Sequence, residues 1–585
     1  MERMNNSIQT LFDQSGTGIP RQDSEATTHG PERFDTTTTA SSNLNFDASR
    51  CPNPPLETLS HFVEIYKAKL HLQPLPLFDI DGLSAQVSRF PQFLLRSFLA
   101  VTLLFSGHPF YGTSKADAIE FYVRSSRETT ISLAAECTPS LEVIQSLCLL
   151  TLSDISAGKQ ARARMNIGMA SVIINLHSKH LEGLKTTSMS VDDKARCCWS
   201  VFILERAFTP GPNTLQPGHS PLVHINYPPS HPRPSDSAHT DVSSIPYLTS
   251  GNATNDLGVN AYCLQLISIW GEIAAYLHQA RLGKVEEPWL ASSTYHKLAA
   301  NFYEFESSLA QVHRFKNVGF QTRSYEEIAR DKSYWSPWLV LQITFHAGQA
   351  LLHHPIFHIA TFRKNNTVFQ PPTFLQHTID QALLHSGWIA RFISMCENLG
   401  YEICDPFLGR LVVVVATIHW IFSLASDETV TERARSDFNH CQRFIIGLAN
   451  KWPQFSQLAN GLENLQSPTR QANGTTSHNG ISSFKISLLW ELLDTNSTVA
   501  RLDMSPQSFA PVEQRISTQY LAPLRESPSY RDAGRFGHST GIPASEFPAS
   551  PLPGFLMSDD FLSHVDIPEL SQLDFRPSLN FHGGL

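Results

Sequence analysis

Dense positive charge is the first feature that this sequence lacks. It holds 44 Lys and Arg against 53 Asp and Glu, a formal net charge of −9, and its Lys and Arg side chains form no dense cluster. Because phosphate contacts need clustered positive side chains, this balance argues against a protein that binds nucleic acid through its whole surface.

Long apolar runs are also missing. The longest, Leu411–Ala425, is shorter than the roughly 20 residues that a membrane-spanning helix needs, and it contains His419. A buried helix is the better interpretation. The first residues, MERMNNSIQTLFDQSG, have no apolar core of the length that a secretory signal requires, so we expect a protein that is not secreted.

The cysteines show no C-x-x-C pair, the spacing of many zinc and redox sites. Most of them fall inside apolar helical patterns, which favours reduced, buried thiols in an intracellular protein. They are Cys51, Cys137, Cys148, Cys197, Cys198, Cys263, Cys396, Cys404 and Cys441.

Apolar residues at helical spacing are abundant, and hydrophobic residues make up 41% of the 585-residue chain. They predict an all-α domain of many helices over about residues 56–495, with long loops at about 207–258 and 465–482. The flanking arms, 1–55 and 496–585, are rich in Ser, Thr and Pro and poor in large apolar residues, so we expect them to be disordered. The predicted helices lie near 56–70, 90–107, 115–136, 138–160, 158–177, 194–211, 261–281, 291–312, 334–357, 374–399, 405–425 and 430–451.

The segment around Trp199 has a clear helical pattern. Trp199, Phe202, Ile203 and Arg206 stand at i, i+3, i+4 and i+7, so a helix presents all four on one face. Arg206 then lies one turn beyond an aromatic and aliphatic stripe.

The order of residues in this region resembles the middle homology region of fungal-specific transcription factors, whose pattern runs roughly G-x-A-x-x-x-A-x-x-L-x-L-H, then R-R-x-W-W and D-R. Three residues depart from it: Cys198 stands in place of a Trp, Glu205 in place of an Asp, and Pro212 follows Gly211 without the usual Arg. The matching residues are Gly168, Ala170, Leu176, His177, Arg196, Trp199 and the pair Glu205-Arg206.

Two later segments extend the resemblance. Tyr334–Phe357 is similar to a family helix that carries an aromatic-His pair and ends in Leu-Leu-His-x-Pro, and here it supplies His346, His353 and Pro355. Trp452 follows the last predicted helix as in the family's closing segment. The resemblance covers about Leu56–Thr495 and implies an all-α regulatory domain.

A typical family member carries a binuclear zinc cluster of six cysteines before this domain. Here Cys51 is the sole cysteine before Cys137, and no zinc-finger spacing replaces the cluster. We therefore expect no zinc and no other cofactor.

The segment Gly554–Phe575 alternates acidic and hydrophobic residues and contains no Lys or Arg. This pattern is typical of a segment that docks as a helix in a partner's groove, as activation segments do. The alternative is that it folds back onto its own domain. The residues concerned are Phe555, Leu556, Asp559, Asp560, Phe561, Leu562, Asp566, Leu570 and Phe575.

Three clusters suggest chemistry. His346, His353 and His354 share a helix spacing that metal ligands use, but no acid or Cys accompanies them, so packing or capping roles are favoured. Asp192-Asp193 suggests the metal-diphosphate site of an all-α terpenoid enzyme, but no third Asp follows at the expected turn, so the pair is better interpreted as a helix cap. Glu205-Arg206 is either structural or part of an effector pocket, and we favour the structural role.

The resemblance implies a nuclear transcription regulator without enzymatic activity, of a kind that often governs a metabolic or secondary-metabolite gene cluster. Its expected partners are the transcription machinery through the C-terminal segment, and a zinc-cluster factor or a second copy. A co-regulator that binds no DNA itself is the first alternative. An all-α enzyme acting on a hydrophobic substrate is the second, and it needs a cluster of carboxylates or a metal site that the sequence does not show.

Overall fold

The computed structural model describes most of the helical region of the chain. The described residues are 45–136, 140–181, 191–209, 233–234, 256–357, 371–425, 427–467, 480–481, 483–494 and 516–517. The expectations for residues 1–44 and for the segment Gly554–Phe575 lie outside them.

Residues 45–55, which the sequence assigns to the N-terminal arm, pack against the helical domain. The Phe46 N–H donates to the carbonyl oxygen of Phe110 at 2.8 Å, and the Phe46 ring lies 5.9 Å from that of Tyr111. Asp47 and Cys51 form an isolated β-bridge. The last residues of the predicted N-terminal arm therefore pack on the helices that follow, because Phe46 supplies an aromatic anchor that the polar composition around it conceals.

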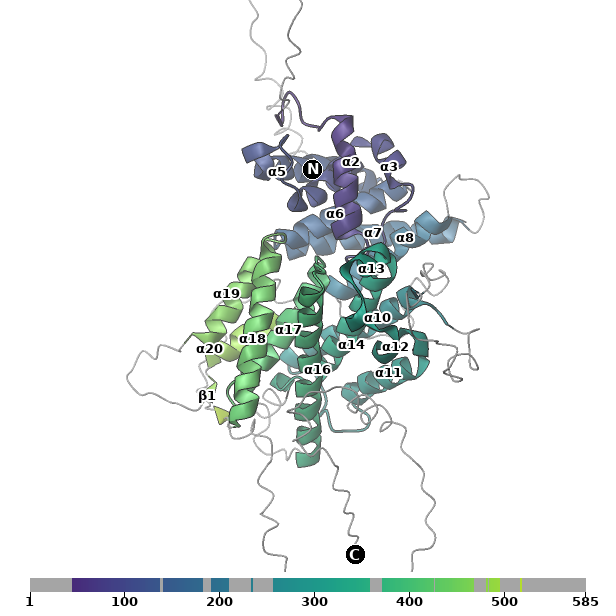
Figure 1. Ribbon diagram of the computed structural model, residues 1–585. Coiled ribbons are helices and arrows are strands. Elements are labelled where there is room, and N and C mark those ends of the chain that lie inside the picture. The colour runs from purple at the N-terminus through teal and green to yellow at the C-terminus, as the bar shows by residue number, and fades with distance from the viewer. Residues whose placement is uncertain are drawn as a thin grey trace, which may run out of the picture. The chain divides into compact units, whose positions relative to one another are not determined.

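The first helices form one packed group (Figure 1). The α4 helix contacts both α5 and α6, and α6 contacts α7 and α8. Nearly every side chain of α6 is buried, as its long apolar run requires. The elements are α2 Leu56–Ile65, the π-helical turn η1 Tyr66–Leu70, α3 Leu83–Gln86, α4 Gln92–Thr102, α5 Lys115–Ala135, α6 Leu141–Ser156, α7 Gln160–Leu181 and α8 Val191–Phe208.

The remaining helices surround α14 and α17. The α14 helix contacts α10, α16 and α17, and α17 also contacts α18 and α19, as Figure 1 shows for the neighbouring green helices. The elements are α10 Val259–Arg281, α11 Thr294–Ser308, α12 Phe315–Val318, α13 Tyr325–Arg330, α14 Lys332–Leu352, α16 Pro372–Asn398, α17 Pro406–Phe422, α18 Glu428–Ala449, α19 Gln454–Gln466 and α20 Ser483–Leu493.

The α17 helix is the predicted buried helix, and its Val and Ile run is enclosed on all sides. It approaches its neighbours closely at Gly409. A Cβ atom there would lie 2.6 Å from Cζ of Phe455 and would also collide with the side chain of Leu448. Glycine is therefore required here for α17 to pack against α18 and α19.

Strand structure is minimal in the described residues. Gly480–Ile481 pairs antiparallel with Ile516–Ser517, and these are two-residue strands. The prediction of an all-α fold is confirmed. The short helices α3, α12 and α13, and the later helices α19 and α20, were not predicted.

None of the described helices is long and apolar enough to span a bilayer.

Candidate regulatory site

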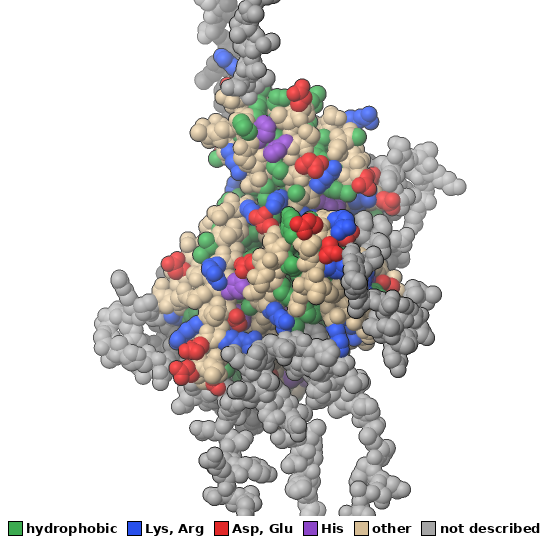
Figure 2. Space-filling model, viewed as in Figure 1, with side chains coloured by type: hydrophobic (Ala, Val, Ile, Leu, Met, Phe, Trp, Pro, Cys, Tyr) green, Lys and Arg blue, Asp and Glu red, His purple; other side chains and the backbone are tan. Residues whose placement is uncertain are grey.

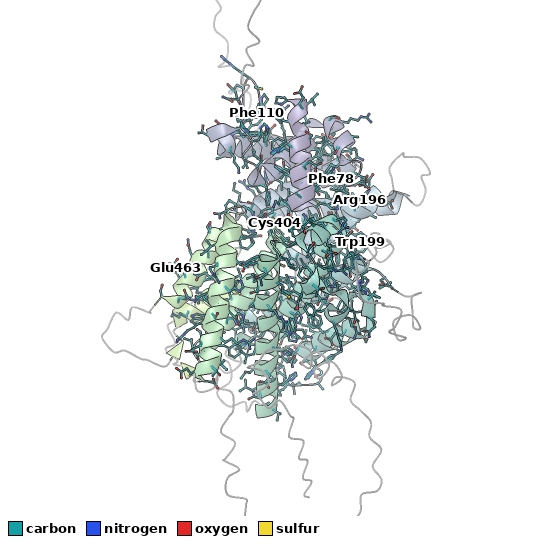
Figure 3. All side chains as sticks on the ribbon, in the orientation of Figure 1. Phe78, Phe110, Arg196, Trp199, Cys404 and Glu463 are labelled. Atoms are coloured by element: carbon teal, nitrogen blue, oxygen red, sulfur yellow. The ribbon has the colours of Figure 1, made fainter. Side chains whose placement is uncertain are left out.

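The predicted face of α8 is buried as a unit. Trp199, Phe202 and Ile203 pack into the core, and the rings of Trp199 and Phe202 meet edge to face with centroids 5.7 Å apart. The Arg206 guanidinium lies over the Phe202 ring, 5.6 Å from its centroid. Figure 3 labels Trp199 and Arg196 on this helix; the Arg196 guanidinium instead pairs with Asp193 at 2.6 Å near the first turn of α8.

Arg206 marks the contact between α8 and α10. Its Cδ atom would lie 3.0 Å from a Cβ placed on Gly271, so the helices approach closely there. Burial raises the pKa of the Glu272 carboxyl, and the Arg206 charge opposes this rise. Asn301 Nδ2 donates to Glu272 Oε2 at 3.1 Å. The Arg206 charge thus acts on an acid of the neighbouring helix α10.

A buried polar network joins α5 and α7 to α6. Arg127 donates two hydrogen bonds to Asp154, at 2.9 and 2.7 Å, and Asn166 Nδ2 donates to Asp154 at 2.9 Å. Asp154 is 1% exposed, so its charge needs these donors. The sequence analysis did not identify this site. Its signal in the sequence is Asp154, an acid within the apolar run of α6.

The family-like residues of α7 divide between two faces. Ala170 is buried, whereas Gly168 is exposed and a Cβ placed on it would meet nothing within 4 Å. His177 also lies in α7, but its side chain is outside the described part of the chain. Glu205 on α8 is half-buried.

His346 contacts an imidazole that the sequence did not identify. His346 Nδ1 and His385 Nδ1 lie 2.9 Å apart, and His346 stacks on Trp388 with centroids separated by 5.5 Å. His385 Nε2 lies 3.2 Å from Gln381 Oε1. Since an amide oxygen only accepts hydrogen bonds, neutral His385 carries its proton on Nε2, and His346 Nδ1 donates to His385 Nδ1. Burial lowers the pKa of both imidazoles, that of His385 to about 3.

His353 and His354, at the C-terminal end of α14, contact separate partners. His353 Nδ1 lies 2.8 Å from Tyr295 Oη, and His354 Nε2 lies 3.0 Å from Thr417 Oγ1. His354 Nδ1 also accepts the Ile356 N–H at 3.0 Å, across the turn that contains Pro355. The three imidazoles therefore do not converge as metal ligands would. No metal-binding group of three or more His, Cys, Asp or Glu occurs among the residues that the structure describes.

Trp452 belongs to a junction between the two groups of helices. Its indole Nε1 donates to the Cys404 carbonyl oxygen at 2.8 Å, and the Cys404 N–H donates to Gln73 Oε1 at 2.8 Å. Figure 3 labels Cys404 at this position. Glu402 forms ion pairs with both Lys69 and Lys451. The loop before α17 thus joins segments more than 300 residues apart in sequence.

Titratable groups in this junction are strongly perturbed. Burial raises the pKa of the Cys404 thiol to about 11 although Lys69 and Lys332 oppose the rise. Burial also lowers the pKa of Lys332 to about 8. Asp405 caps α17 by accepting the Phe407 N–H at 2.7 Å, yet burial raises the pKa of its carboxyl to about 7.

Burial also favours the uncharged form of most of the described cysteines. Burial raises the pKa of the described thiols Cys148, Cys197, Cys198, Cys263, Cys396, Cys404 and Cys441. A protonated thiol is a poor nucleophile, so these cysteines are suited to packing.

Comparison with known proteins finds a distant relative. The chain is 23% identical over 448 residues to an uncharacterized transcriptional regulatory protein of Schizosaccharomyces pombe, an alignment that covers 70% of this chain. It covers 52% of the relative, so the chain spans about half the length of that protein. No protein-family profile matches the chain, and no solved structure matches it.

Proposed function

We propose that this chain is a transcription regulator and that its helical region is a regulatory domain rather than an enzyme. The observation that carries the proposal is the similarity to a transcriptional regulatory protein over 448 residues. The middle homology pattern adds to this support, because its residue Arg206 packs over Phe202 and against Gly271 of α10.

We further propose that DNA contact is made through a partner factor. The sequence contains no cysteine spacing for a zinc cluster. On the face shown in Figure 2, acidic and basic side chains are interspersed, whereas a DNA-binding surface needs basic side chains gathered together. The alternative is an activator that reads DNA itself.

Chromatin immunoprecipitation with sequencing tests the proposal. The tagged protein is followed in cells from which related zinc-cluster factors are deleted one at a time. Promoter peaks that disappear with one factor support partner-mediated recruitment. Peaks that persist through every deletion support direct DNA contact, and an absence of peaks under all conditions contradicts a promoter-bound regulator.

The finer proposals are nuclear localisation and control of a metabolic or secondary-metabolite gene cluster. Both are supported by the family resemblance. Transcript profiling of a deletion strain tests the second, because altered transcripts confined to one physical cluster are expected. Changes scattered across unrelated loci contradict it.

A further inference from the structure

The α7 helix has one well-anchored face. Ala163, Ile167 and Ala170 are buried on it, and α7 contacts α6 and α8. Asn166 on the same face donates to Asp154 of α6. This packing fixes which side chains of α7 point away from the protein.

The outward face of α7 is apolar and lacks a covering element in the described chain. Met165, Val172 and Leu176 are 52%, 54% and 42% exposed. Met169 is half-buried between them, and the spacing of 4, 3 and 4 residues places all four on a single stripe, as in a two-helix contact. A row of exposed apolar side chains belongs more often to a binding surface than to a surface that only faces water.

Gly168 adds a second observation. It lies within the stripe, in the middle of α7, where a Cβ atom would meet nothing within 4 Å. Glycine weakens an exposed helix relative to alanine, so packing inside the described domain does not account for it. A glycine at this position lets the backbone of another helix approach α7 closely.

The charge of α7 restricts the partner. Arg162 and Arg164 are exposed near its start, Lys159 precedes it, and Gln160–Leu181 contains no Asp or Glu. Two copies of such a helix repel each other in either orientation. An acidic amphipathic helix is attracted by the basic end and covers the apolar stripe.

The chain itself contains a segment of this chemistry. Gly554–Phe575 carries five acids, no Lys and no Arg, and its residues Met557, Phe561 and Val565 recur at the spacing of one helix face. We propose that the outward face of α7 is the docking surface for Gly554–Phe575 of the same chain. The docking does not depend on the transcriptional role proposed above.

Length and reach agree with this pairing. The stripe from Met165 to Leu176 extends about 16 Å along α7, and a helix over Met557–Ile567 has a similar length. From Ser517 to Gly554 the chain has about 37 residues, and a random coil of that length has a root-mean-square span of about 33 Å and a much longer maximum reach. Such a tether gives the segment a high effective concentration at α7.

Binding of the isolated segment tests the surface. A fluorescent peptide of residues 554–575 is titrated into the full-length chain whose own segment is disabled by Phe561→Ser and Leu562→Ser, and anisotropy is measured. Val172→Glu places a negative charge in the stripe, so it should weaken binding about tenfold or more. Ile446→Glu, at an equally exposed position on α18 (52%), is the matched control and should leave binding unchanged.

Hydrogen exchange tests docking within one chain. In the full-length chain at low concentration, amides of 554–575 should exchange more slowly than in the Val172→Glu variant, and dilution should not alter the difference. Salt should weaken the protection because the Lys and Arg contacts are screened.

Three results would overturn the proposal. One is absence of peptide binding to the chain with the disabled segment, and another is equal binding by the Val172→Glu variant with helix content intact. The third is a dimer in sedimentation that Val172→Glu dissociates while 554–575 exchanges freely, which would make a second copy the occupant.

Discussion

Acid should destabilise the helical domain through its buried neutral imidazoles. Burial lowers the pKa of His385 from 6.5 to about 3 and that of His419 to about 4. In the unfolded chain these imidazoles bind a proton below about pH 6.5, whereas in the folded chain they stay neutral. The stability that they contribute is therefore fully present above pH 6.5 and is lost as the pH falls toward the folded pKa.

The magnitude follows from the shift. At about pH 5.5 each such histidine removes about 1.4 kcal/mol from the free energy of unfolding relative to neutral pH. For a domain of about 450 residues the unfolding entropy is about 0.9 kcal/mol/K, so one histidine lowers Tm by about 1.5 °C. Asp405 acts in the opposite direction, because its folded pKa of about 7 exceeds 3.8. Its contribution rises by about 2 kcal/mol as the pH falls from about 7.5 to 5.5.

Calorimetry on variants separates these effects. Between about pH 7.5 and 5.5, His385→Gln should reduce the fall in Tm by about 1.5 °C, and Asp405→Asn should increase it by about 2 °C. His296→Gln, at a partly exposed position of α11, is the control and should follow the wild type. If Tm fell with pH in all three variants as it does in the wild type, the assignment of uncharged, buried states to His385 and Asp405 would be refuted.

Three further predictions concern packing. Trp452→Ala should destabilise the domain by about 4 kcal/mol and Trp452→Phe by about 1–2 kcal/mol, because Phe keeps most of the packing and loses chiefly the hydrogen bond to Cys404. Calorimetry on the two variants measures the difference. Equal losses of stability would contradict the contact. Gly409→Ala should lower stability by about 1–3 kcal/mol through collision with Phe455, whereas Gly168→Ala should raise it by about 0.5–1 kcal/mol. Chemical denaturation measures both changes. A stability change of the same sign in both variants would be inconsistent with a packed Gly409 and an exposed Gly168. Arg206→Ala should lower Tm, because it removes packing against Phe202 and the positive charge that acts on Glu272. An unchanged melting curve with a lost regulatory response would instead indicate an effector contact.

Local patterns predicted much of this fold. Helical spacing placed Trp199, Phe202 and Arg206 on one face, and that face is buried in α8. The apolar run before Ala425 predicted the enclosed helix α17. Periodicity succeeds in these segments because burial on one side, or on all sides, is a property of the segment itself.

Long-range partners were beyond such patterns. Nothing local to His346 indicates that His385 lies opposite, and nothing near Gln73 indicates Cys404. These pairs depend on how whole helices pack, which sequence spacing within one helix does not determine. Gly168 was identified as a motif residue, but its exposure became visible only when α7 was placed against α6.

The junction at Cys404 has a consequence for synthesis on the ribosome. Lys69 and Gln73 leave the ribosome about 330 residues before Glu402 and Cys404, their partners. At translation rates of about 5–20 residues per second, the first helices wait roughly 15–70 s for these contacts. During that interval the surface around η1 is exposed to chaperones and to other nascent chains. Aggregation of truncated products that end before residue 402 is therefore the expected result of premature termination.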